Sequence, residues 1–107
     1  MSLFDLEDKV ALITGSTKGI GKAIAKRMSE QGAKIVISSR NQELCDEVAS
    51  EINDSGGTAI AVACNINYKE QLENLVKQAE LRLGKINVLV CNAAINPYFG
   101  ASQEIPD

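Results

Sequence analysis

Short apolar runs alternate with amphipathic segments along the 107-residue chain. The apolar runs cover residues 10–13, 35–37, 59–64 and 86–91. They are nearly continuous rather than alternating, which is typical of strands in a parallel sheet that is covered on both faces. The pattern therefore predicts βαβ units around one parallel sheet.

Three segments between these runs carry apolar residues at three- and four-residue spacing, which predicts amphipathic helices. Each segment ends at glycine, a common helix terminator because it adopts the left-handed conformation at little cost. The apolar positions and their glycines are Ile20, Ala23, Ile24 and Met28 before Gly32, then Leu44, Val48 and Ile52 before Gly56-Gly57, and finally Leu72, Leu75, Val76, Ala79 and Leu83 before Gly84.

The order of these elements predicts one α/β domain over residues 1–107, a Rossmann-type doubly wound parallel sheet with strand order 3-2-1-4. Right-handed crossovers then place the first two helices on one face and the third helix on the other. The strand order reverses between the first and fourth strands. We therefore expect a ligand crevice there, at the carboxyl ends of the strands.

Composition narrows the function classes. A net charge of −3 disfavours nucleic acid as a partner, and the longest apolar run, about six residues, is far below the roughly 20 needed to span a membrane. The acidic N-terminal segment lacks the order of a signal peptide, so we expect a cytoplasmic protein. Cys45, Cys64 and Cys91 are widely spaced and the chain has no histidine, so no metal site is predicted.

Residues 14–21 read T-G-S-T-K-G-I-G, between a predicted strand and a predicted helix. Glycines here allow a sharp turn, close approach of a pyrophosphate and tight packing of the helix. The first backbone amides of the helix would face the phosphates. This context favours a phosphate cradle over an ordinary glycine-rich turn, with the candidate residues Gly15, Ser16, Thr17, Lys18, Gly19, Ile20 and Gly21.

Charge after the second apolar run indicates the cofactor. A free ribose 2′-hydroxyl is usually held by an acidic residue at this position, which here is Ser38-Ser39 followed by Arg40. Arg40 and Lys18 can both bind a 2′-phosphate, whose charge a guanidinium engages with paired hydrogen bonds. We therefore expect Ser39 and Arg40 to bind NADP(H), the alternative being that both cations are solvated surface charges.

The glycine loop, together with Asn92-Ala93-Ala94 after the fourth run, resembles the classical short-chain dehydrogenase/reductase superfamily over essentially the whole chain. The resemblance implies NADPH as cofactor, because both family positions that favour NADP are basic. It also implies that Asn65 and Ile66 lie near the adenine. The family usually has aspartate at position 65, so a turn role for Asn65 stays open. Residues 95–100 resemble NADP-dependent carbonyl and retinol reductases.

Family members transfer hydride with a tyrosine, a lysine four residues later and a preceding serine. Tyr68 is followed by Leu72 at that spacing and Tyr98 by Ser102, so no catalytic residue is assigned. We expect the NADP(H)-binding portion of an oxidoreductase acting on alcohols or carbonyls, inactive as a 107-residue chain.

Two other functions stay open. One is a non-catalytic NADP(H)-binding or regulatory module, and the other is an interaction protein that pairs through a sheet edge. The fourth predicted strand would be an open edge beside an uncovered sheet face. We therefore expect self-association or pairing there.

Overall fold

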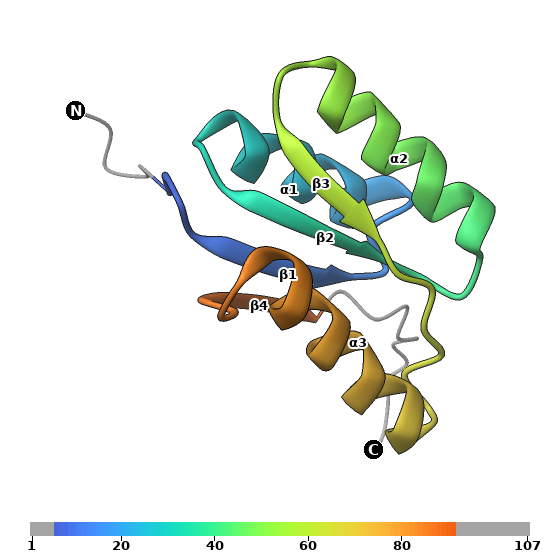
Figure 1. Ribbon diagram of the computed structural model, residues 1–107. Helices are drawn as coiled ribbons and strands as arrows, with labels where there is room; N and C mark the ends of the chain where they lie inside the picture. Colours follow the sequence, from blue (N-terminus) through green and yellow to red (C-terminus); the bar gives the residue numbers. More distant parts are fainter. Residues whose placement is uncertain (1–5, 92–107) are drawn as a thin grey trace, which may run out of the picture.

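The computed structural model describes residues 6–91, which form four parallel strands and three helices. In chain order these are β1 (Val10–Thr14), α1 (Gly19–Glu30), β2 (Lys34–Ser38), α2 (Gln42–Asp54), β3 (Thr58–Ala61), α3 (Lys69–Leu83) and β4 (Val88–Cys91). The strands form one sheet in the order β3-β2-β1-β4, which confirms the predicted doubly wound topology (Figure 1).

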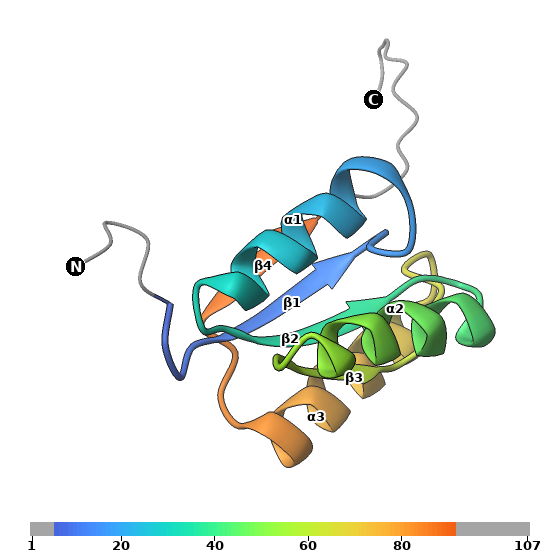
Figure 2. The same cartoon turned by 90° about the horizontal axis from the view of Figure 1, so that it is seen from above.

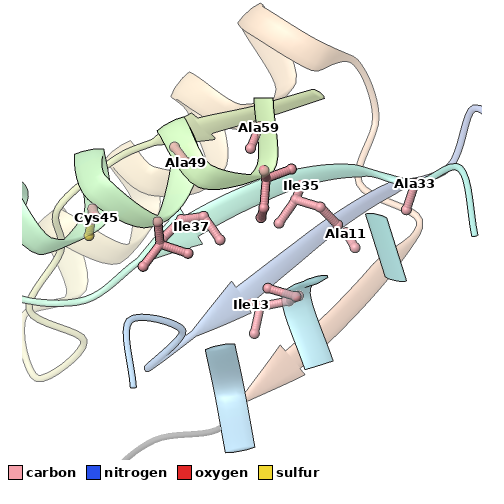
Figure 3. Close-up of a cluster of buried hydrophobic side chains, with 11 residues drawn as sticks. Ala11, Ile13, Ala33, Ile35, Ile37, Cys45, Ala49 and Ala59 are labelled. Atoms are coloured by element: carbon pink, nitrogen blue, oxygen red, sulfur yellow. The ribbon is translucent and has the colours of Figure 1, made fainter. Parts of the chain in front are cut away.

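The helices cover the sheet in two layers, as predicted. Helices α1 and α2 lie on one face and α3 on the other (Figures 1 and 2). Ile13, Ile35 and Ile37 project into the first layer, where they meet α1 and α2 (Figure 3). Leu12 and Val36 project the other way and pack with Leu75 of α3. None of the helices in this part of the chain is long and apolar enough to cross a membrane.

The two central strands differ from the outer ones in burial. Every residue of β1 is buried, as expected for a strand covered on both faces. In β4, by contrast, half-buried and exposed residues alternate. Leu89 pairs in register with Leu12, yet Leu89 is 60% exposed and Leu12 is 1% exposed. The expectation of two covered faces is therefore wrong for β4, because α3 covers β1 but not the neighbouring edge strand. This exposure agrees with the uncovered face expected beside the fourth strand.

Strand β3 is shorter than the apolar run predicted. It ends at Ala61, although the Val62 amide still donates to the Ile37 carbonyl (3.0 Å) and the Cys64 amide to the Ser39 carbonyl (2.8 Å). Between them, the Ala63 amide donates to Oε1 of Gln42, at 3.0 Å. Residues 62–64 therefore stay extended beside the chain that leaves β2, without forming a regular ladder.

The buried face of α1 also differs from the predicted stripe. Ile20 and Ala23 are exposed, whereas Gly21 and Ala25 are buried. Ile24 and Met28 are half-buried and pack against the core, as expected. The smallest side chains of the helix thus face the sheet, which lets the helix approach it closely. The helix is therefore rotated about its axis relative to the orientation that the apolar spacing predicts.

Helices α1 and α2 end in the same way, at the predicted glycines. The Ala33 amide donates to the Met28 carbonyl (3.1 Å) and the Gly57 amide to the Ile52 carbonyl (3.0 Å), the long closing bond of a Schellman motif. Gly32 and Gly56 have φ of +100° and +96°. Gly32 differs in its surroundings, because a Cβ there would lie 2.9 Å from the Glu7 Cα, whereas a Cβ on Gly56 would meet no atom within 4 Å.

We predict that Gly32→Ala destabilises the fold more than Gly56→Ala. Both variants force alanine into positive φ, at a cost of about 1–2 kcal/mol, but only Gly32→Ala also crowds the backbone at Glu7, which typically adds about 1–3 kcal/mol. Urea denaturation of both variants measures the difference. Equal losses of unfolding free energy in the two variants would show that the segment before β1 moves away from the new side chain at no cost.

Glu51 joins α2 to α1 through ion pairs with Lys26 and with Lys22, the latter at 3.4 Å. The pKa of its carboxyl is lowered from the usual value, chiefly by the hydrogen bond from Lys26, although desolvation opposes the shift. A depressed pKa stabilises the fold above the unfolded-state value, about 4.3 for glutamate. That contribution is lost as the pH falls through the folded-state value.

We therefore predict that Glu51→Gln lowers the urea midpoint slightly at neutral pH, and that the difference vanishes near about pH 3. Glu47→Gln is the matched control, since Glu47 is exposed on the same helix and forms no ion pair in the described chain. A difference that persists in acid would rule out the ion pairs as its cause.

Candidate functional site

The candidate site lies where the strand order reverses, at the carboxyl ends of β1, β2 and β3. Residues 15–18 leave β1, residues 39–41 leave β2 and residues 62–68 leave β3, all at this edge of the sheet. Open α/β sheets bind ligands at such an edge. Asn92, Ala93 and Ala94 follow β4 and lie outside the described residues.

The glycine loop has the backbone that its sequence predicts. Gly15 has φ +63° as the chain turns off β1, and Gly19 has φ +54° where α1 begins. A Cβ built on Gly19 would meet no atom within 4 Å, so the side of the loop that glycine leaves bare is open. A ligand can therefore come close to this backbone.

The first turn of α1 has no side-chain cap. Its N-cap residue, Lys18, makes no capping hydrogen bond, and no acidic residue lies in the first turn. In α2, by contrast, Asn41 caps the helix by accepting a hydrogen bond from the Leu44 amide at 3.0 Å. The first amides of a helix lack acceptors within the helix and carry partial positive charge. The start of α1 thus suits a phosphate group.

The other residues of the loop divide between its surface and its interior. Ile20 is 72% exposed beside the first turn of α1, which is unusual for a large apolar side chain. Thr17 is half-buried, and Gly21 is buried against the sheet. Ile20 thus offers an apolar surface next to the open backbone of Gly19.

Ser16 lies behind the loop rather than on its surface. The residue is fully buried, and its hydroxyl lies 2.7 Å from the Ile13 carbonyl oxygen, to which it donates. The Ser16 hydroxyl oxygen in turn accepts a hydrogen bond from the Ser38 amide at 2.9 Å. The Ser16 amide donates to the Ser38 carbonyl at 3.2 Å. Its polar groups are therefore engaged within the protein, away from the surface where a ligand would bind.

The segment after β2 presents a free cation. Arg40 is exposed, and neither it nor the exposed Lys18 forms an ion pair in the part of the chain that the structure describes. Ser39 is half-buried, and its hydroxyl accepts a hydrogen bond from the Asn41 amide at 3.2 Å and lies 3.3 Å from Sγ of Cys45. The segment is therefore ordered around Ser39, with the charge of Arg40 left available.

Asn65 serves as a turn residue after β3. Its Oδ1 accepts a hydrogen bond from the Asn67 amide at 3.0 Å, and its carbonyl accepts one from the Tyr68 amide at 3.1 Å. The Asn65 amide in turn donates to Oε1 of Gln71, at 2.7 Å. The turn role is thus observed, and the contact with adenine stays a prediction. The next residue, Ile66, is exposed at the same edge of the sheet.

Two residues that the sequence did not single out form hydrogen bonds at the two ends of the sheet. Gln42, the first residue of α2, accepts a hydrogen bond from the Ala63 amide through Oε1, and its Nε2 donates to Oδ1 of Asp46 at 2.9 Å. At the other end of the sheet, Asn87 accepts from the Val10 amide (2.9 Å) through Oδ1 and donates its own amide to the Val10 carbonyl (2.9 Å). No periodicity marks either residue, because both partners are distant in sequence.

The cysteines are structural where they are buried. Cys45 and Cys64 are buried free thiols, and burial raises the pKa of the Cys64 thiol. A raised pKa keeps the thiol neutral and therefore unreactive. Within residues 6–91, no three histidine, cysteine or acidic side chains gather in a group that could hold a metal ion.

Comparison with known proteins agrees with this geometry. The dehydrogenase/reductase SDR family member 4 of Sus scrofa is 42% identical over 106 residues, covering 95% of this chain and 38% of the pig protein. The short-chain dehydrogenase/reductase SDRA of Arabidopsis thaliana is 41% identical over 92 residues, covering 86% of this chain and 36% of the plant protein. The chain thus spans less than two fifths of the length of these relatives.

Solved structures match at a similar level. A hydroxysteroid dehydrogenase from Escherichia coli superposes with a TM-score of 0.80 at 39% identity, covering 82% of this chain and 37% of the bacterial one. A metagenomic short-chain oxidoreductase in complex with NADP superposes with a TM-score of 0.75 at 32% identity, covering 79% and 38% of the two chains. The sequence profile of the short chain dehydrogenase family matches residues 9–107, and this chain therefore belongs to the short-chain dehydrogenase/reductase family.

Proposed function

We propose that this chain is the NADP(H)-binding portion of an oxidoreductase that acts on alcohol or carbonyl groups. The observation that carries the proposal is the start of α1, where open backbone at Gly19 adjoins a first turn that no side chain caps. The residues around it fit a dinucleotide. The amides at Gly19 to Gly21 would hold the pyrophosphate, and the exposed Ile20 would contact the bound ligand.

Charge supports NADP(H) over NAD(H). Arg40 stands just after β2, where an acidic residue would otherwise hold a free 2′-hydroxyl. Lys18 stands at the start of α1, and neither cation is neutralised by an ion pair within residues 6–91. A 2′-phosphate has up to two negative charges, which such cations bind through charge-assisted hydrogen bonds. The solved relative with bound NADP has the same overall fold, which is compatible with this choice.

The chemistry of the proposed reaction divides between cofactor and protein. NADPH, when bound, supplies the hydride. A tyrosine can donate the proton only when a nearby cation lowers its pKa from about 10. Neither Tyr68 nor Tyr98 is followed by lysine four residues later. We therefore propose that these 107 residues bind the cofactor but do not reduce a carbonyl by themselves. The buried free thiols of Cys45 and Cys64 support a reducing compartment such as the cytoplasm.

We predict that the chain binds NADPH more tightly than NADH and that Arg40→Asp reverses this preference. Removing one charge-assisted hydrogen bond costs about 1.5–3 kcal/mol, so NADPH affinity should fall by about tenfold or more. The new carboxylate would also repel the 2′-phosphate. Calorimetric titration of both nucleotides measures the change, with Arg82→Asp on α3 as the matched control. Equal affinity of the native chain for NADPH and NADH would refute the role assigned to charge.

The outer edge of β4 favours self-association as a second property. No strand within residues 6–91 pairs with that edge, and Leu89 is exposed beside it. Unpaired edges and exposed apolar side chains both promote association between chains. We propose that a second copy of the chain pairs at this edge, as in strand addition between proteins.

We predict that Leu89→Lys shifts the chain toward monomer in sedimentation velocity, because a charge on an edge strand opposes edge-to-edge pairing. Leu81→Lys is the control, since Leu81 is also an exposed leucine but lies on α3. If the native chain is already monomeric at high concentration, or if both variants behave alike, association through β4 is excluded.

A further inference from the structure

The junction between Ser16 and Ser38 connects two parts of the proposed cofactor site. The Ser16 amide donates to the Ser38 carbonyl (3.2 Å) and the Ser38 amide donates to Oγ of Ser16 (2.9 Å). The two residues thus exchange hydrogen bonds, one of them through the Ser16 side chain, although residues 15–18 belong to no strand. The Ser16 hydroxyl also donates to the Ile13 carbonyl, which ties the junction to β1.

The junction lies close in sequence to both candidate cations. Lys18 is two residues beyond Ser16, and Arg40 is two residues beyond Ser38. Two residues of extended chain span at most about 7 Å. The backbone of each cation is therefore held close to a buried point, since Ser16 is 0% exposed and Ser38 is 1% exposed. The Ser16 hydroxyl makes two of the hydrogen bonds at this point.

We propose that Ser16 is a positioning residue that sets the selectivity of the site for a 2′-phosphorylated dinucleotide, without touching it. By joining the glycine loop to the end of β2, Ser16 holds the pyrophosphate-binding backbone and Arg40 at a fixed separation. A dinucleotide with a 2′-phosphate needs both at once, whereas one with a free 2′-hydroxyl needs only the first. This inference rests on the proposed NADP(H) binding.

The same junction provides a matched control. The Ser38 hydroxyl is buried like that of Ser16, but it has no hydrogen-bond partner in the described part of the chain. Ser38→Ala therefore removes a hydroxyl of the same size and burial from the same place and leaves the junction intact. Ser16→Ala removes the acceptor of the Ser38 amide and the donor to the Ile13 carbonyl.

The test is calorimetric titration of the 107-residue chain and its variants with NADPH and NADH. We expect Ser16→Ala to weaken NADPH binding by about tenfold, the effect of losing roughly one charge-assisted hydrogen bond, and to weaken NADH binding much less. Ser38→Ala should change neither affinity. Equal weakening for both nucleotides, or no weakening, would overturn the inference, because a merely structural serine would not alter the ratio.

A double-mutant cycle adds a second measurement. If Ser16 acts by placing Arg40, then Ser16→Ala should reduce NADPH affinity far less in an Arg40→Gln background than in the native chain. The same loss in both backgrounds would show that the two residues act independently and would refute the inference. Ser16→Cys keeps a side chain of similar shape with a weaker donor and acceptor. It should show the same change in ratio, and it tests the inference if Ser16→Ala does not fold.

Failure of the two proposals can be told apart. If the native chain binds neither nucleotide, the proposed function is wrong. If the native chain prefers NADPH but Ser16→Ala leaves the preference unchanged, the proposed function stands and the role of Ser16 is wrong.

Discussion

The parallel pairing of β1 with β2 is the constraint on which the rest of the structure depends. Five residues of each strand pair in register, nearly all buried. A parallel pair ends both of its strands at the same edge, so the loops after β1 and β2 must emerge side by side. The Ser16–Ser38 junction then adds two hydrogen bonds between the loop after β1 and the last residue of β2.

The candidate site can bind a ligand because these loops leave some backbone groups and charges without partners in the described part of the chain. The backbone of Gly19 is open and the first turn of α1 has no side-chain cap, while Ser39 and Asn41 hold the next loop in place through their own hydrogen bonds. Buried polar groups usually have partners, and at this edge the amide and hydroxyl of Ser16 and the amide of Ser38 are bonded within the protein. The exposed groups, positive in charge or partial charge, face outward, which suits a phosphorylated ligand.

Burial falls from the two central strands of the sheet to its two edge strands. Strand β1 is covered by helices on both faces, whereas β4 keeps its helix-covered face and exposes Leu89 on the other. The relatives that match this chain are more than twice its length. Within residues 6–91, the face of β4 that carries Leu89 is covered by no helix, and the outer edge of β4 is paired with no strand.

The sequence by itself determined the element order, the doubly wound topology and the glycine loop, because apolar periodicity and glycine placement are local signals. The end of β3 and the rotation of α1 were missed, since Gln42 bonding to Ala63 and the burial of Gly21 rather than Ile20 depend on contacts across the sheet. From the sequence, Ser16 and Asn65 were both predicted to lie in the cofactor site. For Asn65 the sequence left a local turn role open, and the structure shows Oδ1 closing that turn. Only the tertiary structure decided that Ser16 is buried at a junction, because a hydrogen-bond partner 22 residues away leaves no pattern along the chain.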